Sequence, residues 1–457
     1  MNQEIRVLSA NLSAAVRMGD DEAIRFVDWV RGAAPYFHAF RGKTFVLAFG
    51  GEVAQVGELM QDLCHDCNLL AALGVRLVLV HGARPQIEAE LTRRGQESHY
   101  HNGIRITDEA ALECVKAAVG VTRINIEAAL SQGLPNTPMA GAYMRVTGGN
   151  FITARPLGVV DGVDFQYSGT VRRVIVEEIK ADLDQQNVVL VSNLGVSPSG
   201  EIFNLVMEDV AEAVAIALQA EKLIYLCDAP GLLDTEGRLI EAITADEAER
   251  KLVAGLGLTE DLHLFLPRAI KAVRKGVARA HLIDRDKDGG LLLEFFTRQG
   301  VGTMVSREPL HRLRQATIDD VATLLQLLGP LEADGTLVRR GRELIEMEIE
   351  RFTLAEHDGV VVGCAALYPF QEEKMAEMAC LAVTPEFRRG GLGERLMQHI
   401  ADRARQGGFK EVFVLTTRTE QWFRERGFRE AGPEELPERK RDLYNFQRRS
   451  KIFIKAL

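Results

Sequence analysis

The chain has 457 residues, a length that predicts two or three domains at roughly 150 residues each. Hydrophobic residues make up 46% of it and charged residues 26%, as in soluble globular proteins, which argues against a disordered chain, a collagen-like repeat or a disulfide scaffold. The net charge of −10 argues against a nucleic-acid partner, because such proteins usually present a basic surface. No run of about 18 apolar residues occurs, so we expect no membrane-spanning helix and no membrane partner.

The cysteines and the N-terminus indicate a cytoplasmic protein. Six cysteines in 457 residues are ordinary cytosolic usage, and the first residues lack the apolar core of a signal peptide. Cys64 and Cys67 form a CxxC on a predicted helix, but no second CxxC follows to complete four zinc ligands. We therefore favour helix packing over a redox or metal role and expect no metal.

The first two-thirds of the chain alternates apolar runs with helical patterns. Residues from about 20 to 34 predict an amphipathic helix, and strands at 44–49 and 76–80 end in glycine-containing turns around a helical stretch. This βαβ pattern predicts an α/β domain with a mainly parallel sheet at 25–306, after an N-terminal segment at 1–24. Further predicted elements are strands at 188–191, 223–227 and 280–283 and a helix at 209–220.

A charged stretch with a proline at 307–313 predicts a linker into a second domain at 314–457. The adjacent hairpin strands and the later βα unit predict a mixed sheet. The expected helices are 318–328, 342–351 and 394–406, and the expected strands are 352–356, 360–368, 375–383 and 412–416.

A glycine-rich turn in this second domain predicts an acyl-CoA site. The apolar strand Cys380–Val383 leads into Arg388-Arg389-Gly390-Gly391-Leu392-Gly393, which opens a helix. Glycines let the backbone approach a ligand, and the helix N-terminus presents N–H groups and a positive dipole end to a pyrophosphate. The arginines add positive charge.

This segment resembles the (Q/R)xxGx(G/A) motif of the GNAT acetyltransferases, with Arg388, Gly391 and Gly393 at the defining positions. The downstream WFRERGF, Trp422–Phe428, fits that family too. The resemblance implies acetyl-CoA as co-substrate. It also implies main-chain contacts to the pantetheine arm from Leu381, Ala382 and Val383, and pyrophosphate contacts from Arg388, Arg389, Gly390, Gly391, Leu392, Gly393 and Glu394. Phe423 stands where many relatives have a tyrosine proton donor, so Thr416, Tyr444 or water must protonate the thiolate.

The first domain resembles the amino acid kinase family, in particular N-acetylglutamate kinase. Four positions differ from active kinases. This chain has Ala48 and Ala213 where those enzymes have lysine, Arg84 where they have glycine and Glu208 where they have aspartate. Phosphoryl transfer depends on cations that neutralise the moving charge. We therefore expect this domain to be inactive as a kinase. The resemblance is carried by Phe45–Gly51, His81–Ile87, Gly103–Asp108, Asn204–Ala215, Ala220–Leu233 and Leu291–Met304.

In this order the two domains resemble the bacterial N-acetylglutamate synthase family, over nearly the whole chain. Further segments that carry the resemblance are Pro35–Val46, Ala366–Val383 and Leu443–Phe453. The resemblance implies acetyl transfer from acetyl-CoA to L-glutamate, the first step of arginine biosynthesis. It also implies feedback inhibition by L-arginine at the kinase-like domain, and a homo-oligomer, commonly a hexamer.

The same resemblance assigns site residues. Glu377 is the expected general base, and strand alternation predicts that it shares a face with residues 379, 381 and 383. For glutamate binding it implies Arg340, with Arg339 as a close competitor, and Cys380, Arg448 and Ser450. For arginine binding it implies Tyr36, Lys222, His281, Glu294, Gly300, Gly302 and Thr303.

Two alternatives stay open at this point. One is a working kinase with an accessory acetyltransferase fold, which Ala48 and Ala213 disfavour. The other is a non-catalytic arginine sensor, which Glu377 and the intact glycine-rich turn disfavour.

Overall fold

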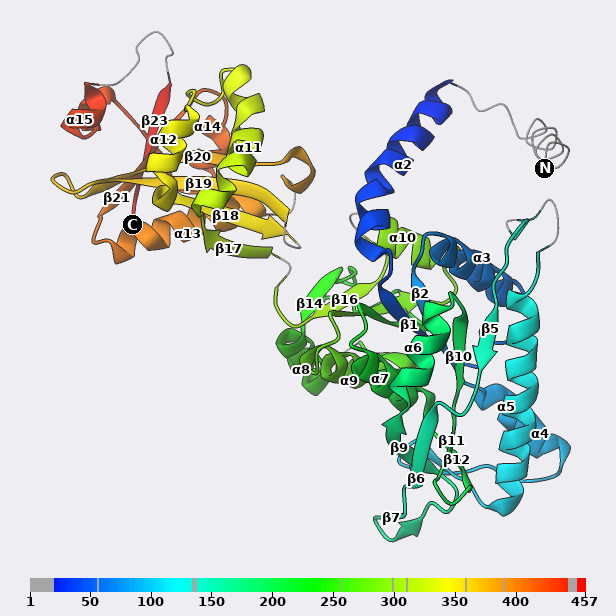
Figure 1. The fold of residues 1–457 in the computed structure, drawn as a ribbon. Coiled ribbons are helices and arrows are strands. Elements are labelled where there is room, and N and C mark those ends of the chain that lie inside the picture. The colour runs from blue at the N-terminus through cyan, green and yellow to red at the C-terminus, as the bar shows by residue number, and fades with distance from the viewer. Residues whose placement is uncertain are drawn as a thin grey trace, which may run out of the picture. The chain divides into compact units, whose positions relative to one another are not determined.

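The computed structural model describes residues 20–55, 57–133, 137, 139–255, 257–297, 300–309, 311–357, 360–388, 391–442 and 450–457. The chain forms two compact units that divide between Glu308 and Pro309. Each unit has its own sheets and its own hydrophobic core. Figure 1 shows the elements of the two units by colour along the chain.

The first unit is built on an eight-stranded sheet in which all neighbours run parallel except β15 and β16. The mainly parallel sheet confirms the prediction from the βαβ pattern. The strands in spatial order are β14 (Ala242–Thr244), β16 (Thr303–Ser306), β15 (Arg279–Asp284), β13 (Lys222–Cys227), β1 (Thr44–Phe49), β2 (Arg76–His81), β10 (Val188–Ser192) and β5 (Val146–Gly148).

Helices cover both faces of this sheet, which explains why the central strands are near-continuous apolar runs, with polar residues only at their ends. In β1, Val46 and Ala48 pack on one helix layer while Phe45 and Leu47 pack on the other. Figure 1 shows the two layers on either side of the sheet, a three-layer sandwich. One layer contains α6 (Val176–Asp184), α7 (Met207–Leu218), α8 (Ala245–Ala254) and α9 (Glu260–Arg274), and the other α2 (Asp20–Phe40), α3 (Glu58–Ala72), α5 (Glu109–Leu130) and α10 (Gly290–Phe296).

Smaller elements complete this unit. Helix α4 (Arg84–Arg93) packs against α5, whose first turn is capped by the Asp108 carboxylate, which accepts a hydrogen bond from the Ala111 N–H at 2.8 Å. A four-stranded sheet contains β12 (Ile202–Asn204), β11 (Leu194–Val196), β6 (Ile152–Pro156) and β9 (Gly169–Val174), and two hairpins pair β3 (His99–His101) with β4 (Ile104–Ile106) and β7 (Val159–Val160) with β8 (Val163–Asp164).

Helix α2 is longer than the sequence pattern indicated. We expected it to end near residue 34, but it continues through Pro35 to Phe40. The extra turns are apolar and aromatic: Phe37 packs edge-on against Phe296 at a ring distance of 5.1 Å. Tertiary packing therefore extends the helix through Pro35 and past the predicted end.

The second unit is a mixed seven-stranded sheet, as predicted. Only β20 and β21 run parallel, and all other neighbours are antiparallel. Part of the expected linker, 307–313, is strand instead, because the residues from His311 onward pair with β18. The spatial order is β17 (His311–Gln315), β18 (Phe352–His357), β19 (Val360–Phe370), β20 (Met375–Val383), β21 (Glu411–Thr416), β23 (Lys451–Ala456) and β22 (Arg429–Ala431).

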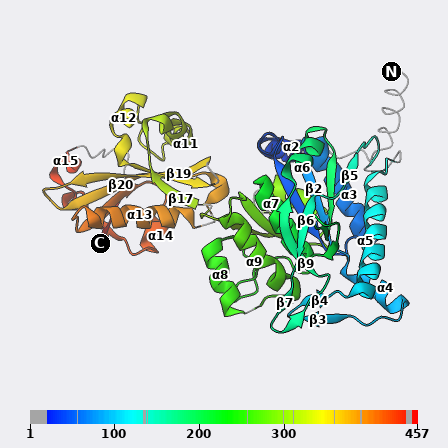
Figure 2. The ribbon, with the colours of Figure 1, turned by 60° about the horizontal axis from the view of Figure 1, so that its bottom comes forward.

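The two faces of this sheet carry different helices, visible in Figure 2 on opposite sides of β19 and β20. Helix α13 (Leu392–Gln406) buries Leu396 and Ile400 against one face, and α11 (Val321–Ala333) and α12 (Arg342–Met347) bury Leu324 and Ile345 against the other. The short helices are η2 (Ile318–Asp320), η3 (Ile349–Arg351), η4 (Pro385–Phe387), α14 (Glu420–Arg424), η5 (Pro433–Glu435) and α15 (Glu438–Arg441).

Candidate functional site

A gap opens in the sheet of the second unit between the two parallel strands. Pairing of β20 with β21 ends at Glu377 and Phe413, although β20 continues to Val383 and β21 to Thr416. Beyond this point β21 pairs with β23 on its other side, and β20 pairs with β19. The inner edges of both strands therefore have main-chain groups that do not pair with each other. Such an opening suits a ligand with amide groups, such as the pantetheine arm, and Leu381, Ala382 and Val383 lie along it.

A bulge at Cys380 changes the faces that the sequence predicted. Cys380 has a φ of 53°, and the register with β19 shifts there. Ala379 and Cys380 both pack with α11 and α12, whereas Leu381 and Val383 pack with α13. Glu377 lies opposite Tyr368, whose ring also faces α11 and α12. The expectation that 377, 379, 381 and 383 share one face is therefore wrong, because one extra residue in a strand reverses the alternation beyond it.

The start of α13 fits a pyrophosphate. Gly391 caps the helix with a φ of 71°, and the first intrahelical bonds are donated to its carbonyl by Glu394 and Arg395. The N–H groups before them belong to the turn that a helix leaves without internal partners. Arg388 contributes charge beside them, and its Nε donates to the Val383 carbonyl at 3.2 Å. Arg389 and Gly390 lie outside the described residues.

The rest of this turn is held by packing and by one ion pair. A Cβ at Gly393 would lie 3.6 Å from the Trp422 ring, so the helix approaches α14 closely there. Arg426 stacks over the same ring at 4.2 Å and pairs with Glu394 at 3.2 Å. Glu394, predicted to bind pyrophosphate, thus holds a cation at the mouth of this turn. Leu392 is buried in the core below it.

Glu377 is a buried carboxylate with a cationic partner. Its side chain is 9% exposed, and its Oε2 lies 2.6 Å from Nζ of Lys440 on α15. Lys440 is a residue that sequence reasoning missed, because it stands in the charged run Glu438–Arg441, which reads as solvated surface. The only available signal was its place between the glycine-rich turn and the final basic segment.

Arg340 faces the same side of the sheet as Glu377. Its guanidinium lies 5.9 Å from the Tyr368 ring. Burial acts to lower the pKa of Arg340, but the neighbouring Cys380 and Tyr368 act to raise it, and the net shift is upward. Arg339 is exposed. The geometry therefore separates the two arginines that the sequence left as competitors, and Arg340 is the one beside Cys380 and Glu377.

Tyr368 was also missed by sequence reasoning. Its hydroxyl donates to Glu348 Oε2 at 2.7 Å, and Arg351 stacks on its ring at 4.6 Å while pairing with Glu348 at 3.0 Å. Burial, then the bond to Glu348, raises the pKa of Tyr368 above its ordinary value. A neutral, oriented phenol thus forms one wall beside Arg340. Burial likewise raises the pKa of Cys380 to about 11, so this thiol stays protonated and is no nucleophile at neutral pH.

Of the remaining predicted residues, the structure describes Thr416, Ser450 and Phe423. Thr416 ends β21, and its hydroxyl lies 2.8 Å from that of Thr419. It shares the α13 face with Val414, so it lies across the sheet from Glu377. Ser450 is buried just before β23, and Phe423 is buried in the core. Arg448 and Tyr444 lie outside the described residues.

In the first unit three residues predicted to bind arginine form one buried relay. His281 Nδ1 lies 2.6 Å from Glu294 Oε1, and Lys222 Nζ lies 3.1 Å from His281 Nε2. The other oxygen of Glu294 accepts the N–H groups of Val301 at 2.7 Å and Gly302 at 2.9 Å. All three side chains are nearly fully buried.

The relay has a defined charge arrangement. Burial, then the charge of Lys222, lowers the pKa of His281 to about 4, so at pH 7 the imidazole is neutral and donates its Nδ1–H to Glu294. Burial opposes ionisation of Glu294, but the bonds from His281 and the backbone outweigh it and lower its pKa to about 2. Burial lowers the pKa of Lys222 to about 7. A fixed carboxylate therefore sits beside a lysine that titrates near neutrality.

The other predicted regulatory residues lie around this relay. Gly300 has a φ of 65°, and a side chain there would meet the Glu294 carboxylate. Thr303 is buried on β16 and accepts the Leu232 N–H at 2.8 Å. Tyr36 on α2 stacks with Phe40 at 6.1 Å, and the Phe40 ring lies 5.1 Å from Lys222 Nζ. The structure thus gathers residues from four separate stretches of the chain.

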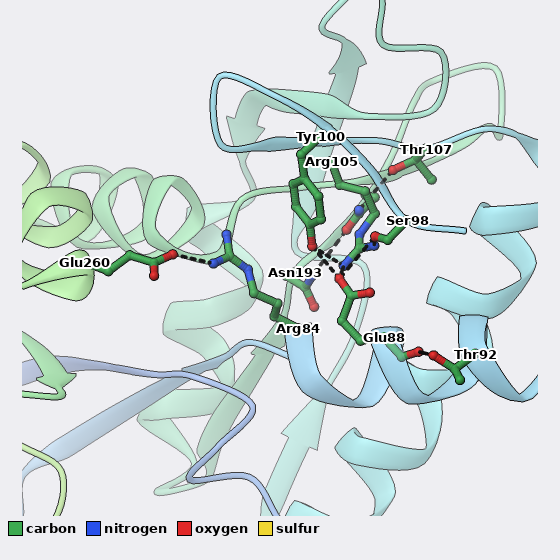
Figure 3. A network of polar contacts seen from close by, with 10 residues as sticks. Arg84, Glu88, Thr92, Ser98, Tyr100, Arg105, Thr107, Asn193 and Glu260 are labelled. Atoms are coloured by element: carbon green, nitrogen blue, oxygen red, sulfur yellow. Dashed lines mark hydrogen bonds and ion pairs between the residues drawn. The ribbon is translucent and has the colours of Figure 1, made fainter. Parts of the chain in front are cut away.

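A second polar network, drawn in Figure 3, surrounds the hairpin of β3 and β4. Arg105 is paired with Glu88 at 2.7 Å and stacks on Tyr100 at 4.8 Å. Arg84, where active kinases have glycine, lies at the start of α4 and pairs with Glu260 at 3.4 Å. These cations are thus paired with carboxylates of the chain itself.

The positions where kinases carry lysine are apolar. Ala48 is fully buried in the core between β1 and α7, and Ala213 packs against the same core. Burial raises the pKa of Glu208 on α7 above its ordinary value.

Within the described ranges, no group of three or more His, Cys, Asp or Glu side chains is placed to hold a metal ion. Cys64 and Cys67 are buried, free thiols on α3. Among the helices that the structure describes, none is long and apolar enough to cross a bilayer.

Comparison with known proteins matches both units. The amino acid kinase family model covers residues 43–284, and the acetyltransferase (GNAT) family model covers residues 318–428. An amino-acid acetyltransferase from Ralstonia nicotianae is 52% identical over 436 residues, which are 95% of this chain and 96% of that relative.

Two solved structures match nearly the whole chain. N-acetylglutamate synthase from Neisseria gonorrhoeae, complexed with coenzyme A and L-arginine, has a TM-score of 0.85 and 39% identity over 94% of this chain and 99% of that chain. The same enzyme complexed with coenzyme A and N-acetyl-glutamate has a TM-score of 0.61 at 39% identity and the same coverage, 94% and 99%. The gap beside Glu377 and the turn at Gly391 fit coenzyme A, and the chain belongs to the amino-acid acetyltransferase family, whose members use acetyl-CoA.

Proposed function

We propose that the chain is an N-acetylglutamate synthase, which transfers the acetyl group of acetyl-CoA to the amino group of L-glutamate. The observation that carries this proposal is the Glu377 carboxylate, buried where β20 and β21 part and flanked by cations on one face. A dicarboxylic substrate needs such cations, and its ammonium needs a base. The N-acetyl-glutamate complex of the Neisseria gonorrhoeae relative supports this choice of substrate.

Glu377 takes a proton from the substrate ammonium, and the freed amine nitrogen attacks the thioester carbonyl from the face that carries α11 and α12. The C–S bond then breaks, the nitrogen passes its second proton to solvent water as the amide forms, and the sulfur takes up one proton. Release of the proton on Glu377 to solvent restores the base. Thr416 at the end of β21, Tyr444 and water remain the candidate donors for that proton. Arg340 and the backbone at Cys380 orient the glutamate, together with Arg448 and Ser450.

The test is Glu377→Gln, which keeps the shape of the side chain but removes the base. We expect kcat to fall about 10²- to 10³-fold while the calorimetric Kd of acetyl-CoA changes little. Glu372→Gln is a matched control, because Glu372 is exposed in the turn just before β20. A Glu377→Gln enzyme within threefold of the wild-type kcat would remove Glu377 from the mechanism.

We further propose that L-arginine binds at Glu294, Lys222 and His281 and inhibits the enzyme from a kinase-like unit that has no kinase activity. Tyr36, Gly300, Gly302 and Thr303 complete that site. A carboxylate has about four acceptor positions, and Glu294 uses three of them for His281, Val301 and Gly302, so one position is left for a guanidinium N–H. The L-arginine complex of the relative supports this assignment. Hydroxylamine trapping with ATP tests the absence of acyl phosphate formation.

We also propose a cytoplasmic homo-oligomer, a hexamer by family resemblance. Helix α2 exposes Ile24, Phe26, Val27 and Trp29, with Trp29 47% exposed, which is unusual for large apolar side chains on one monomer helix. The six buried free thiols suit a reducing compartment. Sedimentation of wild type against Trp29→Glu tests the assembly, and a single monomeric species for wild type would refute it.

A further inference from the structure

The contact between Lys440 and Glu377 is built into the fold. Helix α15 is anchored at its N-terminal end by Leu436, which packs with Phe413 in the sheet, and by the Glu438 N–H, which donates to Glu373 at 3.0 Å. These anchors turn Lys440 inward, to a side-chain exposure of 24%, while its neighbours Arg439 and Arg441 are exposed. The orientation of the Lys440 side chain toward Glu377 therefore follows from the way α15 is anchored.

Stability alone does not explain this ion pair. Taking two charges out of water costs about as much as their attraction returns, so a buried pair is weak support for a stabilising role. A base that must accept a substrate ammonium also gains nothing from a permanent cation on its own oxygen. Lys440 therefore has to leave Glu377 when the amine arrives, and it then needs a new anion.

We propose that Lys440 is a substrate-specificity residue that receives the α-carboxylate of the amino-acid substrate when the substrate ammonium takes its place on Glu377; this rests on the proposed function. The pair, with its charges 2.6 Å apart, is the inverse of an amino-acid zwitterion, whose ammonium and carboxylate share one carbon. On binding, the two ion pairs exchange partners and no buried charge is left alone.

The side-chain carboxylate of glutamate then needs a different cation. Two further carbons separate this carboxylate from the α-carbon, so it lies too far away to contact Lys440 as well. Arg340 lies on the same face of the sheet, beside Tyr368, which is the residue opposite Glu377. Arg351 is already paired with Glu348 at 3.0 Å. The arrangement predicts that Lys440 selects α-amino acids in general and that Arg340 selects acidic ones among them.

The experiment compares Lys440→Met with Arg439→Met, a matched loss of charge on the neighbouring exposed residue. The first measurement is the calorimetric Kd of N-acetyl-L-glutamate in the presence of coenzyme A, because this ligand keeps the α-carboxylate but has no ammonium to contact Glu377. We expect it to weaken about 10- to 100-fold in Lys440→Met and less than threefold in Arg439→Met. Lys440→Arg restores the charge and should recover most of the affinity.

The second measurement is kcat/KM for L-glutamate and for 4-aminobutanoate, which lacks the α-carboxylate. Lys440→Met should lose activity toward glutamate only, so the preference for glutamate falls at least tenfold. Equal losses on both substrates, or an unchanged Kd of N-acetyl-L-glutamate, would overturn the inference. If Lys440→Met fails to fold, as judged by its thermal midpoint, Lys440→Gln replaces it. Wild-type enzyme that releases no coenzyme A with glutamate would instead refute the proposed function.

Discussion

Replacing Glu294 with glutamine should desensitise the enzyme to arginine without touching the acetyltransferase unit. Both backbone N–H groups donate to the same oxygen of Glu294, so the glutamine carbonyl can keep both bonds. Its NH₂ group must then face Nδ1 of His281, where two donors meet. If His281 changes tautomer to accept that bond, its Nε2–H points at the Lys222 ammonium instead. The substitution thus breaks one of the two His281 contacts in either tautomer when Lys222 is charged.

The expected magnitude follows from the loss of one charge-assisted hydrogen bond to guanidinium, about 1.5–3 kcal/mol. That free energy corresponds to roughly a 10- to 150-fold higher arginine concentration at half inhibition. Uninhibited turnover should stay within about twofold of wild type, because inhibition from the first unit is a coupling between separate sites rather than a contact with substrate.

The assay titrates arginine against coenzyme A release and, in parallel, against calorimetric heat. Glu178→Gln is the control, since Glu178 is exposed on α6 of the same unit. Unchanged inhibition in Glu294→Gln would place the arginine site elsewhere. Loss of uninhibited activity would show that Glu294 supports the folded assembly instead.

Three further predictions each concern one residue: His81, Arg340 and Gly391. Burial lowers the pKa of His81 to about 4 from 6.5, so its contribution to stability is complete above pH 6.5 and is lost toward pH 4; at pH 5 the loss is about 2 kcal/mol. Chemical denaturation at pH 5 and pH 7.5 should show a smaller difference for His81→Gln than for wild type or for His263→Gln, an exposed control. Arg340→Ala should raise the KM for glutamate about 10- to 100-fold, and Arg339→Ala less than threefold; equal effects would contradict the assignment. Gly391→Ala has open space for its methyl group but a φ of 71°, so it should raise the KM for acetyl-CoA and leave that for glutamate unchanged.

The sheets were predictable because their strands are apolar runs of distinctive length. The strand 44–49 and the strand 375–383 agree with the structure at both ends. In contrast, α2 continues six residues past the predicted end at residue 34, to Phe40. Pro35 is a reasonable local signal for a helix end, but Phe37 and Phe40 pack on aromatic residues of α10 that lie far away in the sequence. Local pattern alone does not contain that contact.

The residues of the candidate site were assigned from the sequence and stay predictions, whereas the faces of the sheet on which they lie were predicted wrongly. The glycine-rich turn was singled out by its motif, and Glu377 was assigned by resemblance to the family. The bulge at Cys380 was not predicted, because the residue that adopts the positive φ of 53° is a cysteine and not the glycine that usually marks such a position. One bulge is enough to place Glu377 and Val383 on opposite faces. Lys440 was missed for a related reason, because the sequence of a charged run does not show which of its side chains points toward the sheet.

Two buried carboxylates in this chain have partners of different kinds, and the difference follows from their tasks. Among the described residues, Glu294 is held by two backbone N–H groups and an imidazole, donors that keep their positions. Such a carboxylate keeps its orientation whether or not a guanidinium is bound. Glu377 instead pairs with the end of a flexible lysine side chain. A base that must exchange its partner in every turnover needs a cation that can move about as far as the substrate ammonium does, and lysine, unlike a backbone amide, supplies that movement. The proposed regulatory site is therefore preorganised and the proposed catalytic one exchangeable, which is why substitutions at Glu294 should change arginine affinity while those at Lys440 should change substrate choice.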